Sequence, residues 1–248
     1  MTQAMRAIAR FEITRSLRRP FSWVVLALAQ GFMAVLFLLM TVQFLGLNAQ
    51  LQAQGVSRAI MIPHFRAAAL LVVVVTPMLT MGVLSGDRRD GKLDFLFSAP
   101  VSSFDIVAGK LLAVLSCAGA LWFLVSLIPL TLLWGAPIDL GIYFTNLLGL
   151  ALFLLLHCCI GIAASAITRQ PVLAGFAALI VSLSLWFADW ANRLDPASSS
   201  LGTVSTLGRL RGFAIGFINS ADIAYFIIVA VLFFTFAVWS VESERQWA

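Results

Sequence analysis

The chain has 248 residues, of which 61% are hydrophobic and 11% charged, and its formal net charge is +5. A soluble domain carries roughly 25% charged residues, so a chain this apolar cannot cover itself with polar surface in water. The composition excludes a soluble globular protein and predicts an all-α integral membrane protein. The positive-inside rule accounts for the net charge without nucleic acid, because the basic residues flank apolar runs.

Six apolar runs are long enough to cross a bilayer as helices, which takes about 20 residues. They cover Phe21–Leu47, Ala67–Leu84, Leu111–Trp134, Ile142–Ile167, Val172–Trp190 and Ile223–Val241. Pro77 and Pro129 fall inside two of these runs, where neighbouring helices can satisfy the freed carbonyls. The run after Pro20 is too long for the apolar core of a typical signal peptide, so we expect it to remain as the first span.

Basic residues are distributed unequally between the two sides of these spans. Eleven fall on one side: Arg6, Arg10, Arg15, Arg18, Arg19, Arg88, Arg89, Lys92, Lys110, Arg169 and Arg245. Five fall on the other: Arg58, Arg66, Arg193, Arg209 and Arg211. The positive-inside rule then places both termini in the cytoplasm. The connection between spans five and six, Asp189–Asp222, is expected outside.

Residues 1–20 are predicted to form a helix on the cytoplasmic surface, separated from the first span by Pro20. Met5, Ile8 and Ala9 cluster on one face of this helix, but Glu12 falls on the same face. A simple interfacial anchor would have a cleaner apolar face. The mixture favours packing against protein.

The sequence offers little for catalysis or ion coupling. His157 is the one clear ionisable group inside a span, and transporters that couple to ions need buried carboxylates or relays. The three cysteines, Cys117, Cys158 and Cys159, lie in apolar runs. On a helix, the side chains of His157 and the two adjacent cysteines point about 100° apart, so they favour core packing over a metal site. His64 is expected in the outer loop between spans one and two. Gly86–Leu93 resembles a phosphate loop but lacks the Ser or Thr that holds magnesium. We therefore expect no enzyme activity and no cofactor or metal in this chain.

The loop between the second and third spans, residues 85–110, combines many charges with clustered apolar residues. Leu93, Phe95, Leu96 and Phe97 interrupt the charges, and such residues favour burial against a partner. An amphipathic turn resting on lipid is the alternative interpretation. Ser102 and Asp105 have the spacing of a capping box, which predicts a new helix leading into the third span.

This loop resembles the cytoplasmic signature of ABC-2 type permeases, the membrane subunits of one class of ATP-binding-cassette exporters. The matching positions are Asp87-Arg88, Gly91, Leu93-Asp94, Leu96, Pro100-Val101-Ser102, Ile106 and Gly109-Lys110. The loop departs from the signature at Asp87, where Glu is usual, and at Lys92, where Thr is usual. A second stretch, Arg209–Trp247, resembles the last quarter of the gliding-motility (Gld-type) permeases.

The resemblance implies the fold of a type V ABC exporter transmembrane domain over residues 1–248, with an N-terminal connecting helix and a cytoplasmic coupling helix. It implies a bacterial inner-membrane permease subunit that couples ATP hydrolysis in a partner ATPase to export or to a conformational signal. ATP and Mg would be bound by that ATPase dimer. A second permease copy or a homologue, membrane lipids and an auxiliary outer protein are further implied partners. Alternatives are the permease of a copper-enzyme maturation system and a non-transporting scaffold.

Asp87–Ala99 is the predicted coupling helix. Its assigned contacts with the ATPase are Asp87, Arg88, Arg89, Gly91, Asp94, Phe95, Leu96, Phe97 and Pro100. On the outer side, Asp189–Asp222 is predicted to fold over the ends of the spans, with Leu207–Phe217 dipping into the interface and Pro196 and Ser198–Ser200 forming loop. The assigned residues of this outer element are Arg209, Arg211, Phe213 and Asp222, the last as cap of the sixth span.

Small residues one helical turn apart occur at Gly161 and Ser165 and at Ala174 and Ala178. Such pairs let helices approach closely. They predict pairing between two permease copies, although the same pattern packs helices within one chain.

Overall fold

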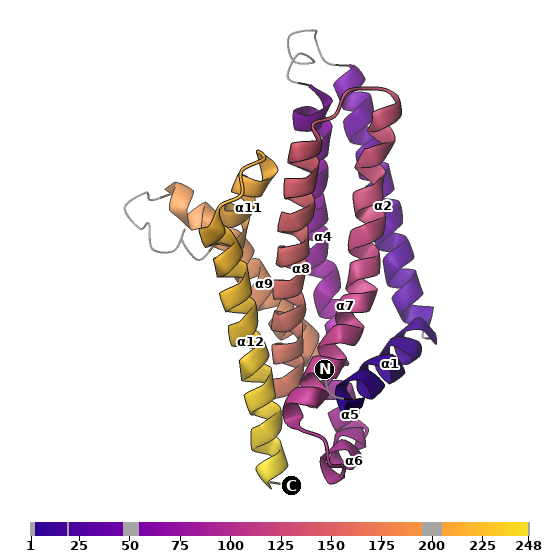
Figure 1. Ribbon diagram of the computed structural model, residues 1–248, viewed down its shortest axis with the longest axis vertical. Helices are drawn as coiled ribbons and strands as arrows, with labels where there is room; N and C mark the ends of the chain where they lie inside the picture. The colour runs from indigo at the N-terminus through magenta and orange to yellow at the C-terminus, as the bar shows by residue number, and fades with distance from the viewer. Residues whose placement is uncertain (1–2, 19, 47–54, 195–204, 248) are drawn as a thin grey trace.

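The computed structural model describes residues 3–18, 20–46, 55–194 and 205–247, and these residues form an all-helical bundle (Figure 1). Six candidate membrane spans are found among them, which confirms the predicted number. The helices that contribute to these spans are α2 (Pro20–Leu45), η1 (Ser57–Met61) with α4 (Ile62–Thr80) and, as far as Arg89, α5 (Ser85–Arg89), α7 (Ser103–Leu127) with η2 (Ile128–Trp134), α8 (Leu140–Ile167), α9 (Pro171–Leu194) and α12 (Ser220–Trp247). The predicted Pro196 and Ser198–Ser200 loop lies outside the described residues.

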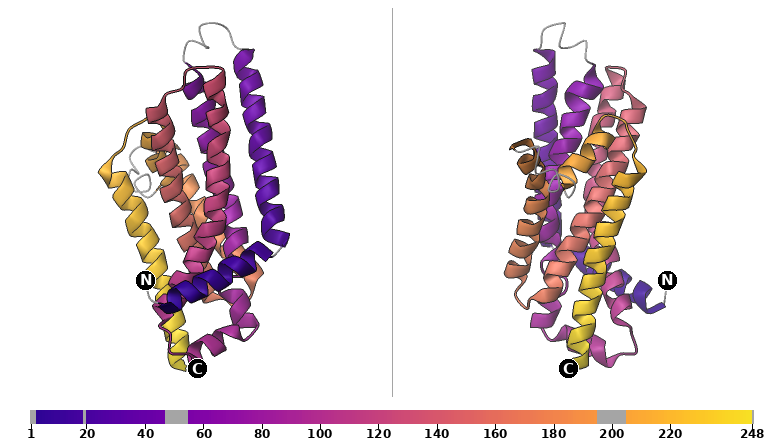
Figure 2. Two further views of the ribbon diagram at one scale, coloured as in Figure 1. Left: turned by 45° about the vertical axis from the view of Figure 1, so that its right-hand side comes forward. Right: turned by 90° about the vertical axis from the view of Figure 1, so that its left-hand side faces the viewer.

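Four shorter helices lie at the two ends of the bundle (Figures 1 and 2). The end drawn lowest in Figure 1, here the lower end, carries α1 (Gln3–Arg18), α5 (Ser85–Arg89), α6 (Lys92–Ser98) and the end of α12. The opposite, upper end carries α11 (Thr206–Ala214). Helix α1 runs across the spans, and both ends of the described chain lie with it at the lower end.

Helix α8 is the central element, packing against α4, α7, α9, α11 and α12. A Cβ atom added to Gly161 of α8 would lie 2.1 Å from Thr80 Oγ1 of α4, so only glycine permits this approach. Ser165, one turn later, accepts hydrogen bonds from the Leu84 and Ser85 amides, which satisfies the backbone where the chain leaves α4 for α5. Ala174 and Ala178 are likewise buried within the chain. The small-residue pairs thus pack helices of one copy and provide no argument for a dimer.

Two spans begin well before their predicted limits. The second begins at Ser57, because the π-helical turn η1 leads directly into α4. His64 is therefore a fully buried residue of α4, with its ring Nε2 3.1 Å from the Val125 carbonyl, and its expected position in an outer loop is wrong. The third begins at Ser103, where Ser102 accepts a hydrogen bond from the Asp105 amide. That contact confirms the predicted helix start.

Candidate functional site

The predicted coupling helix Asp87–Ala99 is two helices instead of one. Helix α5 ends at Arg89, and α6 begins at Lys92. Between them Gly91 has φ +70°, a left-handed conformation that glycine adopts without a steric penalty. This glycine, part of the quoted signature, breaks the helix and turns α6 away from α5.

Helix α6 has one face toward the protein and one toward solvent. Leu93 is buried, and Leu96 and Phe97 are partly buried against the hydrophobic core, as the helical spacing i, i+3, i+4 would favour. Phe95 points the other way and is 78% exposed, flanked by exposed Asp94 and Ser98. Leu96 and Phe97, which we assigned to the ATPase contact together with Phe95, thus pack partly within their own chain. Pro100 is exposed beyond the end of α6.

A buried cluster of charges joins α5 to α1 and α7. Lys110 of α7 is 0% exposed, and its Nζ donates to Asp87, to Glu12 at 2.9 Å and to the Val83 carbonyl at 2.9 Å. Arg15 of α1 donates to the second oxygen of Asp87 at 2.9 Å. Two cations thus face two carboxylates, and the cluster has no net formal charge. Asp87 is committed inside the chain and cannot serve as the surface contact that we predicted.

The position of Glu12 explains the irregular face of α1. Helix α1 packs on α7 where Gly109 would place a Cβ only 2.9 Å from Ile8 Cγ2, so the two backbones approach closely. Met5 and Ala9 are buried at this contact, and Glu12 reaches Lys110 one turn further on. Burial lowers the pKa of Arg15, but the hydrogen bond and the charge of Asp87 raise it above the ordinary value, so Arg15 stays charged.

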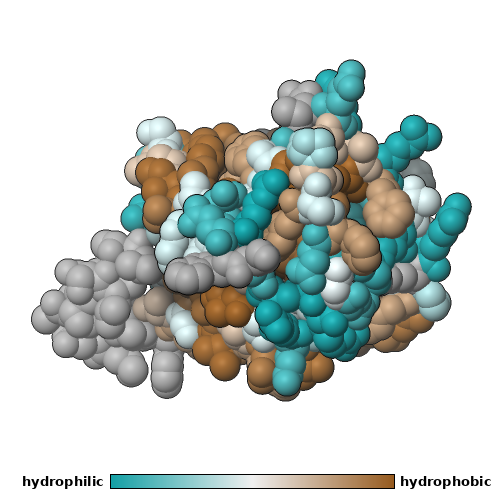
Figure 3. All heavy atoms as spheres, turned by 90° about the horizontal axis from the view of Figure 1, so that it is seen from below, coloured by the Kyte–Doolittle hydropathy of each residue, from teal (hydrophilic) through white to brown (hydrophobic). Residues whose placement is uncertain are grey.

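The end of α12 holds the same segment from the other side. Glu244 accepts hydrogen bonds from Nε and Nη2 of Arg88, at 2.8 and 2.5 Å. Arg245 donates to the carbonyl of Phe97 in the last turn of α6, at 3.3 Å, and to that of Val101 just beyond α6, at 2.7 Å. Arg88 therefore faces inward, whereas Arg89 remains exposed beside Asp90. Seen from below, polar side chains gather on this end among hydrophobic ones (Figure 3).

The sequence assigned no ion-pair partner to Glu12, Arg15, Lys110, Glu244 or Arg245. Their partners lie far away in the sequence, with Arg15 72 positions before Asp87 and Glu244 156 positions after Arg88. The one available signal was Glu12, a carboxylate on an otherwise apolar helix face.

At the upper end, the predicted outer segment contains α11. Phe213 is buried, and its carbonyl accepts hydrogen bonds from Thr145 at 2.8 Å and Asn146 at 3.2 Å of α8. Arg209 pairs with Asp222 at 2.8 Å, and Arg211 pairs with Asp189. The capping role predicted for Asp222 is wrong. Helix α12 begins earlier, at Ser220, and Asn219 Oδ1 accepts from the Ala221 amide.

The remaining chemical candidates lie in the packed interior. Cys117, Cys158 and Cys159 are buried free thiols. His157 is buried in α8, with Nδ1 2.8 Å from the Phe153 carbonyl and its ring against the Phe153 ring. Within the described residues, no group of three or more His, Cys, Asp or Glu side chains could hold a metal ion.

Six helices long and apolar enough to cross a membrane, with a short helical segment anchored to α1, α7 and α12, define a multi-pass membrane protein. The sequence pattern of the ABC-2 family transporter proteins matches residues 6–189, which is more than half of the chain. The chain belongs to this family, and it is a permease, the membrane subunit of an ABC transporter. A search of curated proteins finds no match. Because the family match ends at residue 189, it does not bear on the Gld-type resemblance of Arg209–Trp247.

Proposed function

We propose that the lower end docks a cytoplasmic ABC ATPase through the α5–α6 segment, residues 85–98. ATP and Mg would be bound by the ATPase, and its movements would be passed to the spans. The exposed Phe95 at the outward face of α6 is the single observation that carries this proposal. A large aromatic residue surrounded by charged and polar neighbours is typical of the centre of a protein interface.

The contacts on either side of this segment support a transmission role. A movement of α6 would be transmitted to α1 and α7 through Asp87, Arg15 and Lys110. It would be transmitted to α12 through Arg88, Glu244 and Arg245. Such a segment moves with the helices to which it is tied. On this proposal the lower end is cytoplasmic, as the distribution of basic residues predicts.

The deciding variant is Phe95→Asp. Burying such a side chain contributes roughly 1.5–3 kcal/mol, so its loss should weaken ATPase co-purification by about ten- to a hundredfold. Leu96→Asp is a poorer test, because Leu96 packs against the core of its own chain. Trp134→Asp is the matched control, since Trp134 is 92% exposed at the upper end. Wild-type ATPase binding and ATPase-dependent function in Phe95→Asp would refute the docking site.

We further propose that two permease copies, or this chain and a homologue, assemble with two ATPase subunits, as the family resemblance implies. An auxiliary outer protein docked on α11 belongs to the same proposal. Cross-linking in active membranes should trap a permease pair, and a species that stays monomeric would contradict pairing. Export and transmission of a conformational signal both fit this assembly. A non-transporting scaffold would instead work without ATPase activity.

A further inference from the structure

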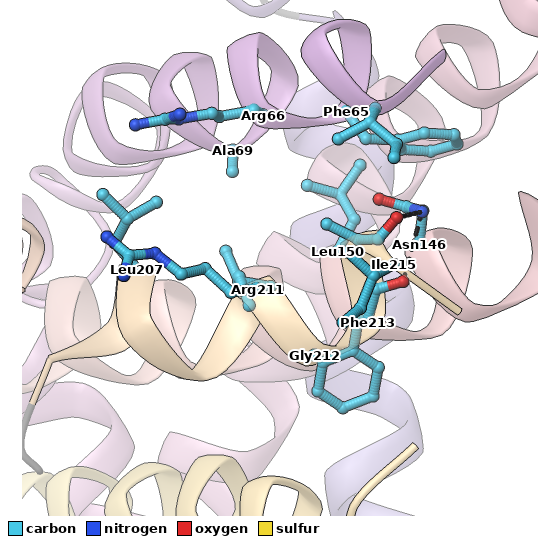
Figure 4. Close-up of a pocket in the computed structure, with 13 residues that line it drawn as sticks. Phe65, Arg66, Ala69, Asn146, Leu150, Leu207, Arg211, Gly212, Phe213 and Ile215 are labelled. Carbon is cyan, nitrogen blue, oxygen red and sulfur yellow. Dashed lines mark hydrogen bonds between the residues drawn. The ribbon is translucent and has the colours of Figure 1, made fainter. Parts of the chain in front are cut away.

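An apolar pocket of about 500 Å³ opens at the upper end between α4, α8 and α11, within the size range of ligand sites (Figure 4). Ala69 of α4, Leu150 of α8 and Leu207 and Leu210 of α11 contribute apolar wall. Two cations interrupt it, Arg66 of α4 and Arg211 of α11, and Figure 4 shows both side chains extending toward the same end of the pocket, away from Phe213.

The two arginines differ in their partners. Arg211 pairs with the buried carboxylate of Asp189, which neutralises it. Arg66 is exposed, and nowhere in the described part of the chain does a carboxylate pair with it. It lies near the upper end of the second candidate span, Ser57–Arg89, where a long cationic side chain can reach the lipid headgroups. The pocket mouth therefore has one formal positive charge in excess and fits a ligand with one negative charge.

The helix below Arg66 indicates what else this ligand carries. Leu70, Val74 and Met78 follow at intervals of four residues and are each at least 40% exposed, so they form an apolar stripe on the same side of α4. At 1.5 Å per residue, the stripe from Arg66 to Met78 is roughly 18 Å long. That is comparable with one leaflet of a hydrocarbon core that is about 30 Å thick.

We propose that this pocket binds one anionic phospholipid of the leaflet at the upper end, with its phosphate against Arg66 and its acyl chains along Ala69 and the α4 stripe. Arg66 donates to the phosphate oxygens, and Arg211 remains shared between Asp189 and the lipid. A guanidinium matches a phosphodiester in charge and in the geometry of its donors. Binding of this lipid does not depend on the ATPase, so it goes beyond the proposed function.

The test is lipid binding to the purified full chain in detergent, followed by native mass spectrometry. Phosphatidylglycerol is titrated against diacylglycerol with the same acyl chains, which lacks the phosphate. Arg66→Gln should weaken phosphatidylglycerol binding by about tenfold, the loss expected for one charge-assisted contact, and should leave diacylglycerol binding unchanged. Retained diacylglycerol binding also shows that the variant is folded.

Arg58→Gln is the matched control, because Arg58 is an exposed arginine on η1 that does not line the pocket. It should change neither affinity. Equal phosphatidylglycerol binding by wild type and Arg66→Gln, as expected if a second copy covers this face, would overturn the proposal. Glycerol phosphate that competes as strongly as the lipid would also overturn it, since the site would then select a soluble anion.

Discussion

The two ends of the bundle use ion pairs for different purposes. At the lower end, the pairs join segments 72 and 156 positions apart and surround the fully buried Lys110. At the upper end, they join positions 13 and 22 apart, and the two arginines have side chains that are 29% and 51% exposed. Arg211 of the upper pairs lines a pocket of about 500 Å³, whereas Glu12 and Arg15 of the lower cluster line one of only about 110 Å³.

This difference indicates that the helices can move relative to one another more easily at one end than at the other. Buried pairs between distant segments require α1, α5, α7 and α12 to move together, because separating them would leave charges unpaired away from water. The upper pairs fasten α11 to its sequence neighbours and leave room beside it. Rearrangement therefore costs less free energy at the upper end.

The largest effect is expected for Lys110→Met. Removing one partner of a buried ion pair costs about 3–5 kcal/mol, because Asp87 and Glu12 would lose their buried cation. Thermal unfolding of the purified chain measures the loss. Lys92→Met is the matched control, since Lys92 pairs with Asp90 at the surface and should cost about 0–1 kcal/mol. Equal effects of the two substitutions would contradict a special role for the buried cluster.

A smaller effect is expected for the contact between α5 and α12. A double-mutant cycle with Arg88→Gln and Glu244→Gln should give a coupling free energy of about 1–3 kcal/mol, because Glu244 accepts two charge-assisted hydrogen bonds. Chemical denaturation of the four proteins measures it. Additive single substitutions would show that α12 is not tied to α5 in this way.

The smallest effect is expected at the upper end. The same cycle with Arg209→Gln and Asp222→Asn should give a coupling free energy of about 0–1 kcal/mol. Arg209 is 29% exposed, against 8% for Arg88, and one hydrogen bond joins it to Asp222. A coupling equal to that of Arg88 and Glu244 would remove the distinction between the ends.

Local patterns in the sequence predicted the helices but not the contacts between them. Apolar run length gave six spans, and the spacing of Ser102 and Asp105 gave the start of α7. The break at Gly91 was missed, although glycine between charged residues was a signal for it. The start of the second span was also missed, because His64 and Arg66 lowered the apolarity of a continuous helix.

The site itself was predicted only in outline. The α5–α6 segment was found from its mixture of charged and apolar residues, but the direction of each side chain was not. Asp87 and Arg88 resembled surface charges because their partners, Lys110, Arg15 and Glu244, lie in other helices. Sequence proximity carries no information about such pairs, and folding alone brings them together.

Arg245 has a consequence for the order in which the protein is made. It holds the carbonyls of Phe97 and Val101, yet it is synthesised 148 positions after Phe97. The α5–α6 segment therefore leaves the ribosome long before the helix that fixes its end has been inserted. On the proposed docking site, the ATPase can bind productively only after α12 has crossed the membrane. Nascent chains arrested before α12 should recruit no ATPase. Recruitment by such chains would show that the Arg245 contacts are dispensable for assembly.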